Sequence, residues 1–181
     1  MLRKILLVII LVLAAFAVVV ALQPSEFRIT RSATLAAPPE AVFPHVNNLH
    51  KWEDWSPWAK LDPNAKTTFE GPDEGAGAIM RWDGNQEVGA GFMTIVKSNP
   101  SELIALRLEF IKPFAGIGDT EFTFHPEAEK TVVTWTMSGH NDFIGKAVGL
   151  IMDCEKMVGG QFENGLANLK QIVESEKGTA Q

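Results

Sequence analysis

The sequence predicts an α+β domain: one antiparallel sheet of seven strands, with helices before and after it, behind an apolar N-terminal helix. Residues Ile5 to Leu22 are apolar without interruption. Between residues 67 and 140, short alternating segments are separated by turn residues, which is typical of antiparallel strands. Near the C-terminus, apolar side chains recur at helical spacings of 4, 3 and 4: Phe162, Leu166, Leu169 and Val173. The 181 residues suit one domain of ordinary size plus a short appendage.

The apolar run follows Arg3 and Lys4 and precedes a polar stretch at Gln23. Its 18 residues would reach about 27 Å as a helix, enough to cross a thin hydrocarbon core. A cleaved signal peptide, the alternative, has a shorter apolar region ending in a small-x-small site, such as Ala15 to Ala17. We predict an uncleaved single-pass anchor in the cell membrane, with residues 1–26 forming anchor and linker. Positive charges stay inside, so the remaining chain is expected to be extracytoplasmic, and periplasmic in a bacterium.

The first strand is predicted from Phe27 to Leu35, with Phe27, Ile29, Ala33 and Leu35 on one face. A short helix then begins at Pro38 to Glu40, because proline needs no amide partner in a first turn and an acid suits the positive helix end. Pro44 is compatible with this helix only if the first turn is still open there.

Residues 49–58 are predicted to form a second short helix or turn that carries three tryptophans. Six further strands follow, and the breaks between them are short, so neighbouring strands are expected to be antiparallel. The predicted strands are Thr67–Glu70, Ala76–Trp82, Glu87–Ser98, Glu102–Ile111, Gly118–Pro126 and Lys130–His140. The glycines at 75, 77, 89 and 91 are expected to permit bends and bulges within a curved sheet. Residues 27–181, up to and including the last helix, form one domain without internal repeats.

The order of these elements is strand, two short helices, six strands and long helix. Five groups of residues agree with a known family in this order: Ala37-Pro38-Pro39-Glu40 with Val42-Phe43, Trp52 with Trp55-Ser56-Pro57-Trp58, Gly75-x-Gly77-Ala78 with Trp82, Thr131-x-Val133-Thr134-Trp135-x-Met137-x-Gly139, and Gly165-Leu166 with Leu169-Lys170. From about Phe27 to Val173 the chain resembles the START-like, or Bet v 1-like, SRPBCC superfamily, specifically its polyketide cyclase/dehydrase and lipid-transport group. The resemblance implies a helix-grip fold with a ligand cavity between the curved sheet and the long helix. Ligand carriers, cyclases and coenzyme-Q-binding proteins share this fold, so the fold alone does not fix the function.

Charge and cysteine content exclude several functions. The net charge is −6, and without Arg3 and Lys4 it is −8, from 14 basic and 22 acidic residues. Nucleic-acid binding, which needs a basic face, is therefore not expected. The lone Cys154 excludes an intramolecular disulfide and is expected to be a packing residue. The four histidines show no HExxH motif or paired ligand spacing, so no metal is predicted, and no cofactor is expected.

Large apolar side chains are the predicted ligand-binding residues. Alternation directs Trp82, Trp135 and Met137 inward, although a filled core would show the same pattern. Trp55 is expected to pack in the core. The predicted lining consists of Trp52, Trp58, Met80, Trp82, Phe92, Phe110, Trp135, Met137 and Phe143.

His140, Arg81 and Asp142 are the candidates for a catalytic or ligand-orienting polar group. His140 ends the last strand, just before the loop where the cavity of this family often opens, although solvent exposure is its expected state. The G-x-S-x-G, GxGxxG and Walker A motifs are absent from the sequence. A catalytic function is therefore not favoured.

These features predict a membrane-anchored module that binds a small hydrophobic ligand: a lipid, an isoprenoid or a polyketide-like compound. Two alternatives remain. The first is a cyclase or dehydratase-type enzyme that uses the same cavity and needs a titratable group inside it. The second is an envelope regulatory domain that binds a protein partner through its tryptophans.

Overall fold

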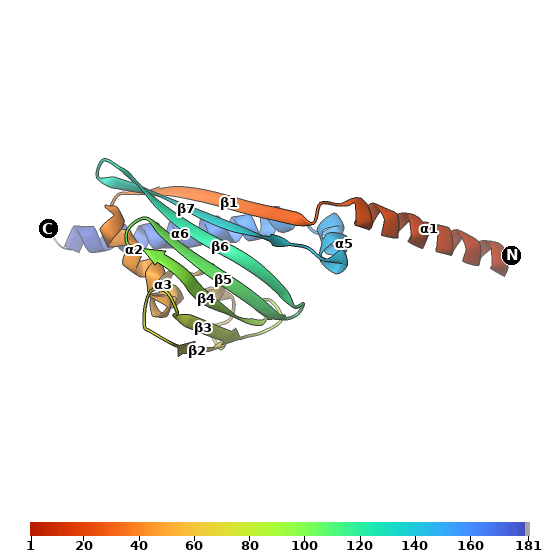
Figure 1. Ribbon diagram of the computed structural model, residues 1–181, viewed down its shortest axis with the longest axis horizontal. Helices are drawn as coiled ribbons and strands as arrows, with labels where there is room; N and C mark the ends of the chain where they lie inside the picture. The colour runs from red at the N-terminus through yellow and green to blue at the C-terminus, as the bar shows by residue number, and fades with distance from the viewer. Residues whose placement is uncertain (180–181) are drawn as a thin grey trace.

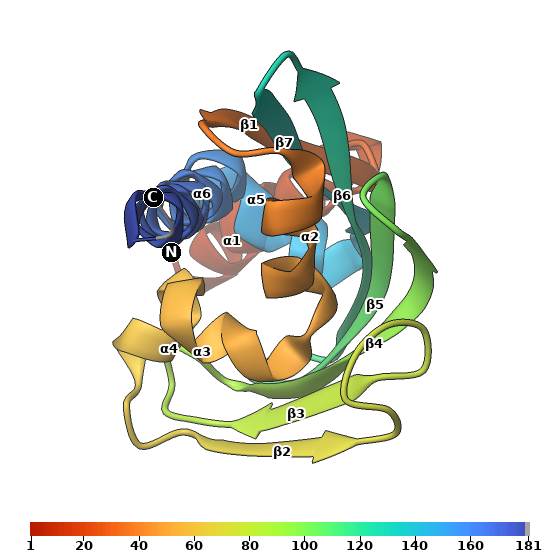
Figure 2. The same cartoon turned by 90° about the vertical axis from the view of Figure 1, so that its left-hand side faces the viewer.

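The computed structural model describes residues 1–179, which form a curved sheet wrapped around helices, with one helix projecting from the domain (Figure 1). The projecting helix is α1 (Leu2–Leu22), and the long helix lying in the hollow of the sheet is α6 (Cys154–Thr179). Figure 2 shows the sheet as a curved wall that holds α6 and the short helices on its inner side. This is the predicted helix-grip arrangement.

Helix α1 has 21 residues and therefore a length of about 31 Å. It is the one helix among the described residues that is long and apolar enough to cross a membrane. Most of its side chains are exposed, whereas Val20 near its end is fully buried. Three residues, 23–25, connect α1 to the first strand.

The seven strands are β1 (Glu26–Leu35), β2 (Lys66–Glu70), β3 (Ile79–Asp83), β4 (Ala90–Asn99), β5 (Leu103–Lys112), β6 (Gly116–Glu127) and β7 (Lys130–His140). Their order in the sheet is β1-β7-β6-β5-β4-β3-β2, and every neighbouring pair is antiparallel. The predicted meander is confirmed from β2 to β7, and β1 closes it by pairing with β7.

Two predicted strand starts are wrong because turns occupy them. β3 begins at Ile79, not at Ala76, since Gly75 and Gly77 have φ angles of +79° and +95° that an extended strand does not allow. β4 begins at Ala90, not at Glu87, because the Asn85 side chain accepts hydrogen bonds from the amides of residues 87 and 88. Gly91 does lie at a register shift between β4 and β5, as predicted.

Four short helical segments lie between β1 and β2: α2 (Pro39–Asn47), η1 (Leu49–Lys51), α3 (Trp52–Trp55) and α4 (Pro57–Leu61). The expectation for Pro44 is wrong, because α2 continues past it to Asn47. Proline removes one helical hydrogen bond, and burial of Val42, Phe43 and Val46 offsets that loss. The single helix or turn predicted over residues 49–58 is three short pieces, broken at Pro57, which cannot donate a backbone hydrogen bond.

The predicted last helix is confirmed, since α6 buries the four side chains expected to face the core. Helix α5 (Phe143–Ile151) was not predicted, because the segment was expected to begin as a loop. Asp142 caps α5 by accepting a hydrogen bond from the amide of Gly145 at 2.7 Å. α5 lies beside α1, at the end of the domain from which α1 projects (Figure 1).

Candidate functional site on the inner face of the sheet

The inner face of the sheet is the surface that faces α6, and strand pairing arranges its side chains in rows. One row crosses six strands: Phe27, Gly139, Gly118, Leu108, Met93 and Met80. The row behind it, farther from α1, contains Ile29, Met137, Thr120, Leu106 and Ile95. Neither row contains an ionisable side chain. The first row, together with Met137, is called the inner mouth below.

Glycines on the inner face make room for large side chains of the neighbouring strands. A Cβ atom on Gly118 would lie 2.7 Å from the methyl carbon of Met137, and one on Gly139 would lie 2.9 Å from the Phe27 ring. A Cβ atom on Gly91 would likewise lie 2.7 Å from the Trp82 ring. The large side chains therefore lie flat on the sheet, and they remain partly exposed.

Behind the mouth, an aromatic cluster fills the space between sheet and helices. Trp135 stacks on Phe162 of α6 with ring centroids 4.1 Å apart and an interplanar angle of 8°. Trp52 and Trp55 pack edge-on against Phe122 and Trp135. This end of the fold is a packed core, as in most protein interiors.

Two buried polar atoms on the inner face have no hydrogen-bond partner among residues 1–179: the hydroxyl of Thr120 and the indole nitrogen of Trp135. The two residues are only 3% and 2% exposed. Thr120 pairs with Met137, and Trp135 pairs with Phe122. Thr120 and Trp135 are therefore diagonal neighbours, with Cα atoms roughly 7–8 Å apart. Buried polar groups usually find partners, and an unmade bond costs about 1–3 kcal/mol. The inner face therefore offers one hydroxyl and one N–H donor in apolar surroundings.

Trp52 and Trp58, two of the predicted lining residues, belong to the aromatic cluster. Trp52 is 5% exposed and donates its indole N–H to the carbonyl of Val46 at 2.9 Å, so its polar atom is already paired. Trp58 is half-buried and packs edge-on against Trp135 and Phe162. Trp55 is fully buried, as expected.

Met80, Trp82, Phe110 and Met137 lie on the inner face as predicted, and all four are partly exposed. The expectation for Phe92 is wrong. Strand pairing places Phe92 opposite Arg81 and Glu109, on the outer face of the sheet. There the guanidinium carbon of Arg81 lies 4.5 Å from the centre of the Phe92 ring. This cation–π contact covers the ring, so an apolar side chain is stable outside the core.

The three catalytic candidates lie away from the inner face. Arg81, on the outer face, donates to Glu70 at 2.7 Å, and this bond lowers the pKa of Glu70 and raises that of Arg81. His140 is exposed, and its ring nitrogen lies 3.5 Å from a carboxylate oxygen of Glu26. Asp142 caps α5, as described above.

Phe143, the last of the predicted lining residues, is the first residue of α5 and is 52% exposed. It therefore does not belong to the strands that form the inner mouth.

Arg31 is a charged residue on the inner face that sequence reasoning missed. It pairs with Trp135 in the third row, and alternation along β1 places it on the same face as Ile29 and Ala33. Its Nε donates to Glu163 at 2.6 Å, and its Nη1 lies 2.8 Å from Glu155. The bond to Glu155, followed by that to Glu163, raises the pKa of Arg31. Both acids belong to α6, so Arg31 joins β1 to this helix and does not offer a free charge.

Two hollows occur on the outer face of the sheet, and both have charged walls. One of about 210 Å³ includes Arg28, Asp119 and Glu121 in its lining. The other, of about 320 Å³, includes Lys66 and Arg81. Charged walls suit an apolar ligand poorly, because burying an unpaired charge is costly. The inner face is therefore the better candidate site.

Comparison with known proteins decides the family. Residues 26–174 match the family described as polyketide cyclase / dehydrase and lipid transport. The chain belongs to this family. The match spans the whole sheet and most of α6, and the family therefore supports a module that binds a small hydrophobic ligand. A search of curated proteins found no match.

Solved structures support the same fold. The chain is similar to protein CV1439 from Chromobacterium violaceum, with 18% identity over 84% of this chain and 99% of that chain, and a TM-score of 0.58. The Zhui aromatase/cyclase from Streptomyces sp. R1128 has 18% identity over 82% and 94% of the two chains, with a TM-score of 0.57. Ara h 8.0201 has 13% identity over 83% and 99%, also with a TM-score of 0.57. At these identities the likeness shows the helix-grip, Bet v 1-like fold.

Proposed function

We propose that this member of the polyketide cyclase/dehydrase and lipid transport family is a membrane-anchored binding module for a small hydrophobic molecule. In this proposal residues 1–26 are the anchor and linker, and residues 27–181 are the ligand-binding domain. The ligand enters at the inner mouth and reaches Thr120 and Trp135 in the two rows behind it. The observation that carries the proposal is the pair of unpartnered polar atoms, on Thr120 and Trp135, within an apolar face.

The chemistry of the inner face indicates the ligand class. Binding sites for small molecules are mostly apolar, with a few polar groups that fix orientation. The indole N–H of Trp135 needs an acceptor, and the Thr120 hydroxyl can donate or accept. A lipid, isoprenoid or polyketide-like compound with one carbonyl or hydroxyl group meets both requirements.

Space for such a ligand comes from movement of side chains at the inner mouth. Met80, Met93 and Met137 are unbranched and flexible, so they can change rotamer at little cost. Met137 lies over Gly118, where the sheet itself carries no side chain. Each 100 Å² of apolar surface buried by the ligand contributes about 2.5 kcal/mol before the cost of association.

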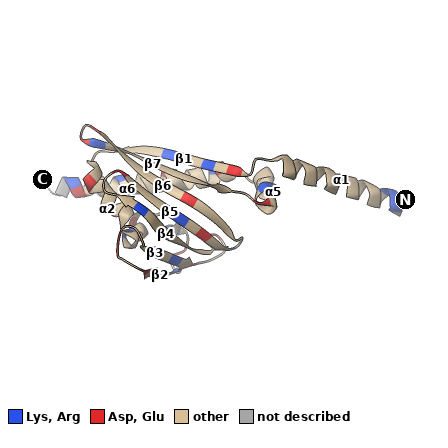
Figure 3. Cartoon of the chain, in the orientation of Figure 1, with Lys and Arg blue, Asp and Glu red and all other residues tan. Residues whose placement is uncertain are grey.

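The membrane anchor is supported by the length and composition of α1. Its basic residues, Arg3 and Lys4, lie at its first turn, and Figure 3 shows no other charge along the helix. We infer a single-pass orientation in which these two residues stay on the cytoplasmic side and the domain is extracytoplasmic.

Binding, not catalysis, is the function that the inner face supports. The first two rows contain no group that could transfer a proton near neutral pH, and Arg31 in the third row is held by two carboxylates. An enzyme of the cyclase type would need such a group close to its substrate.

The test is to purify the full chain in a mild detergent, extract it with organic solvent and identify the extracted compounds by mass spectrometry. We expect an apolar compound in near-stoichiometric amount, and less of it from a Thr120→Val, Trp135→Phe double variant. The matched control is Arg81→Met on the outer face, which should retain the compound. An empty extract, with no thermal stabilisation by lipids, isoprenoids or aromatic polyketides, would contradict the proposal and favour the alternative of a protein partner.

A further inference from the structure

One end of the domain exposes large apolar side chains on two separate elements. On α5 these are Phe143, Ile144, Leu150 and Ile151, which are 52%, 56%, 40% and 80% exposed. At the β5–β6 connection they are Phe114 in the turn and Ile117, the second residue of β6, which are 62% and 51% exposed. This set of six residues is called the apolar end. Soluble proteins rarely leave such clusters in water, so the cluster indicates a contact with an apolar phase or partner.

Helix α5 is unusual because it is almost entirely apolar yet not part of the core. None of its nine residues, all of which the structure describes, is buried, and Lys146 is its one charged residue. A largely apolar helix normally lies in a core or in a membrane. The interface between lipid headgroups and acyl chains accepts a helix that keeps a polar group toward water, and Lys146 can extend its ammonium group to water while its stem stays in apolar surroundings.

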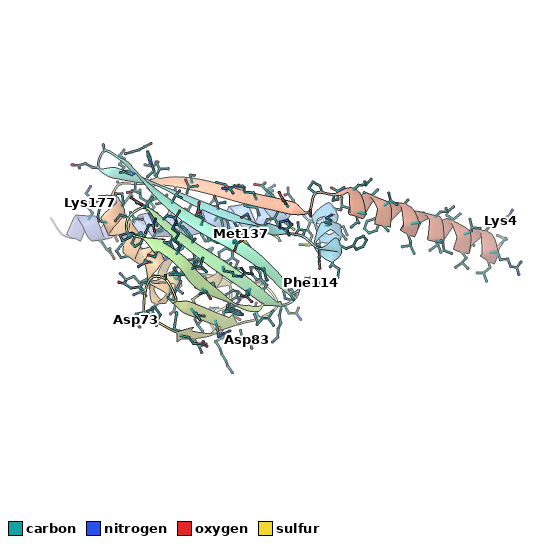
Figure 4. All side chains as sticks on the ribbon, viewed as in Figure 1. Lys4, Asp73, Asp83, Phe114, Met137 and Lys177 are labelled. Carbon is teal, nitrogen blue, oxygen red and sulfur yellow. The ribbon has the colours of Figure 1, made fainter. Side chains whose placement is uncertain are left out.

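The apolar end lies where α1 leaves the domain. The three residues between α1 and β1 can span at most about 11 Å. The amide of Asn141, just before α5, donates to the carbonyl of Ser25 in this linker at 2.7 Å. Figures 1 and 4 show α5 and Phe114 at the α1 end, with Asp73 and Lys177 farther from it. If α1 crosses a bilayer, the apolar end therefore lies next to the surface of that bilayer.

The inner mouth lies at the same end. Phe27 is the second residue of β1, and Gly139 is the next to last residue of β7. β7 then leads directly into α5 through Asn141 and Asp142.

We propose that the apolar end rests in the headgroup region of the bilayer as a second membrane contact beside α1. This contact places the inner mouth directly on the membrane surface. The ligand is therefore a molecule dissolved in the membrane, and it passes between bilayer and inner face without crossing water. The inference rests on the proposed anchor and ligand-binding function, and it adds the source of the ligand.

The contact is apolar in nature, which sets its salt dependence. Without Arg3 and Lys4 the chain carries 14 basic and 22 acidic residues, so attraction to anionic lipids is not what holds it. Zwitterionic phosphatidylcholine vesicles should therefore be sufficient, and added salt should not release the apolar end.

The test is the membrane depth of spin labels on the full chain in phosphatidylcholine vesicles. In a Cys154→Ser background, single cysteines replace Val12 in α1, Ile144 in α5, Phe114 at the β5–β6 turn, or Asp73 at the far end of the domain. We expect labels at 12, 114 and 144 to be more accessible to oxygen than to a water-soluble nickel complex, and the label at 73 to show the reverse. Labels at 114 and 144 that behave like the label at 73, with 12 still in the bilayer, would overturn the second contact alone. A label at 12 exposed to water would overturn the anchor, and this inference with it.

A charge variant tests α5 separately. Ile144→Glu with Ile151→Glu should move the label at 114 into water, whereas Val96→Glu should leave it in the bilayer. Val96 is 55% exposed, against 56% for Ile144, so the control places a carboxylate on an equally exposed apolar site outside the apolar end. Circular dichroism and the Tm confirm that each variant is folded. An unchanged depth at 114 in the folded α5 variant would refute the role of α5.

Discussion

Replacing Thr120 by valine should make the protein more stable and, at the same time, reduce its capacity for ligand. The Thr120 hydroxyl is buried and has no partner, so folding removes it from water without replacing its hydrogen bond. Such a group costs about 1–3 kcal/mol, and valine has nearly the same shape without the hydroxyl. We expect the free energy of unfolding to rise by about 1 kcal/mol, which for a chain of this size raises the Tm by about 2–4 °C.

Thr131→Val is the matched control. Thr131 is also fully buried, but its hydroxyl donates to the carbonyl of Ala37 at 2.7 Å. The same substitution there leaves a buried carbonyl unpaired, and it should lower the free energy of unfolding by about 1–3 kcal/mol. Thermal unfolding of the wild type and both full-chain variants in the same detergent, each first freed of bound apolar compound, measures the difference.

The two variants should also differ in bound ligand. If the Thr120 hydroxyl holds a ligand, Thr120→Val carries less extractable apolar compound than the wild type, whereas folded Thr131→Val carries the normal amount. A fall in Tm for Thr120→Val as large as that for Thr131→Val would refute the reasoning, because it would mean that the Thr120 hydroxyl is already paired in the ligand-free protein.

Two further predictions concern the contacts that hold the fold. Gly160→Ala should raise the free energy of unfolding by about 0.5–1 kcal/mol, because nothing lies within 4 Å of its new methyl group; Gly159→Ala should gain less or lose stability, since its methyl would lie 2.2 Å from Nη2 of Arg31. If both variants gained the same free energy of unfolding in denaturant, the Arg31 side chain would not require a glycine at position 159. The lowered pKa of Glu70 means that its pair with Arg81 contributes stability above the normal carboxyl pKa and loses it as pH falls through the lowered value. Glu70→Gln should therefore flatten the acid limb of the stability curve slightly, and an unchanged limb would show that this exposed pair contributes nothing.

The sequence by itself determined the architecture of the domain. Spacing of Phe162, Leu166, Leu169 and Val173 was enough to orient α6, because a helix can bury only one face of that period. Alternation and short turns were enough for an antiparallel sheet, because parallel strands would need long crossovers. The apolar run of α1 was visible because 18 consecutive apolar residues are long enough to span a membrane as a helix.

Strand alternation also predicts the face on which Arg31 and Thr120 lie. Arg31 has the same parity as Ile29 and Ala33, and Thr120 has the same parity as Phe122. Both therefore lie on the inner face, although a charged or polar residue is easily assigned to water. For Thr120, the missing partner becomes visible only when the neighbouring strands are in place.

Only the tertiary structure decided which face each ambiguous strand buries. In β4 both faces carry apolar side chains, so alternation alone does not decide between Phe92 and Met93. In the structure Met93 is buried, and Phe92 lies on the outer face against Arg81. The position of α5 outside the core also depends on the tertiary structure. Its composition favours burial, yet the hollow of the sheet is already filled by α6 and the aromatic cluster, so α5 remains outside, beside α1. Side-chain volume inside the sheet is a property of the whole fold, and no local pattern in the sequence encodes it.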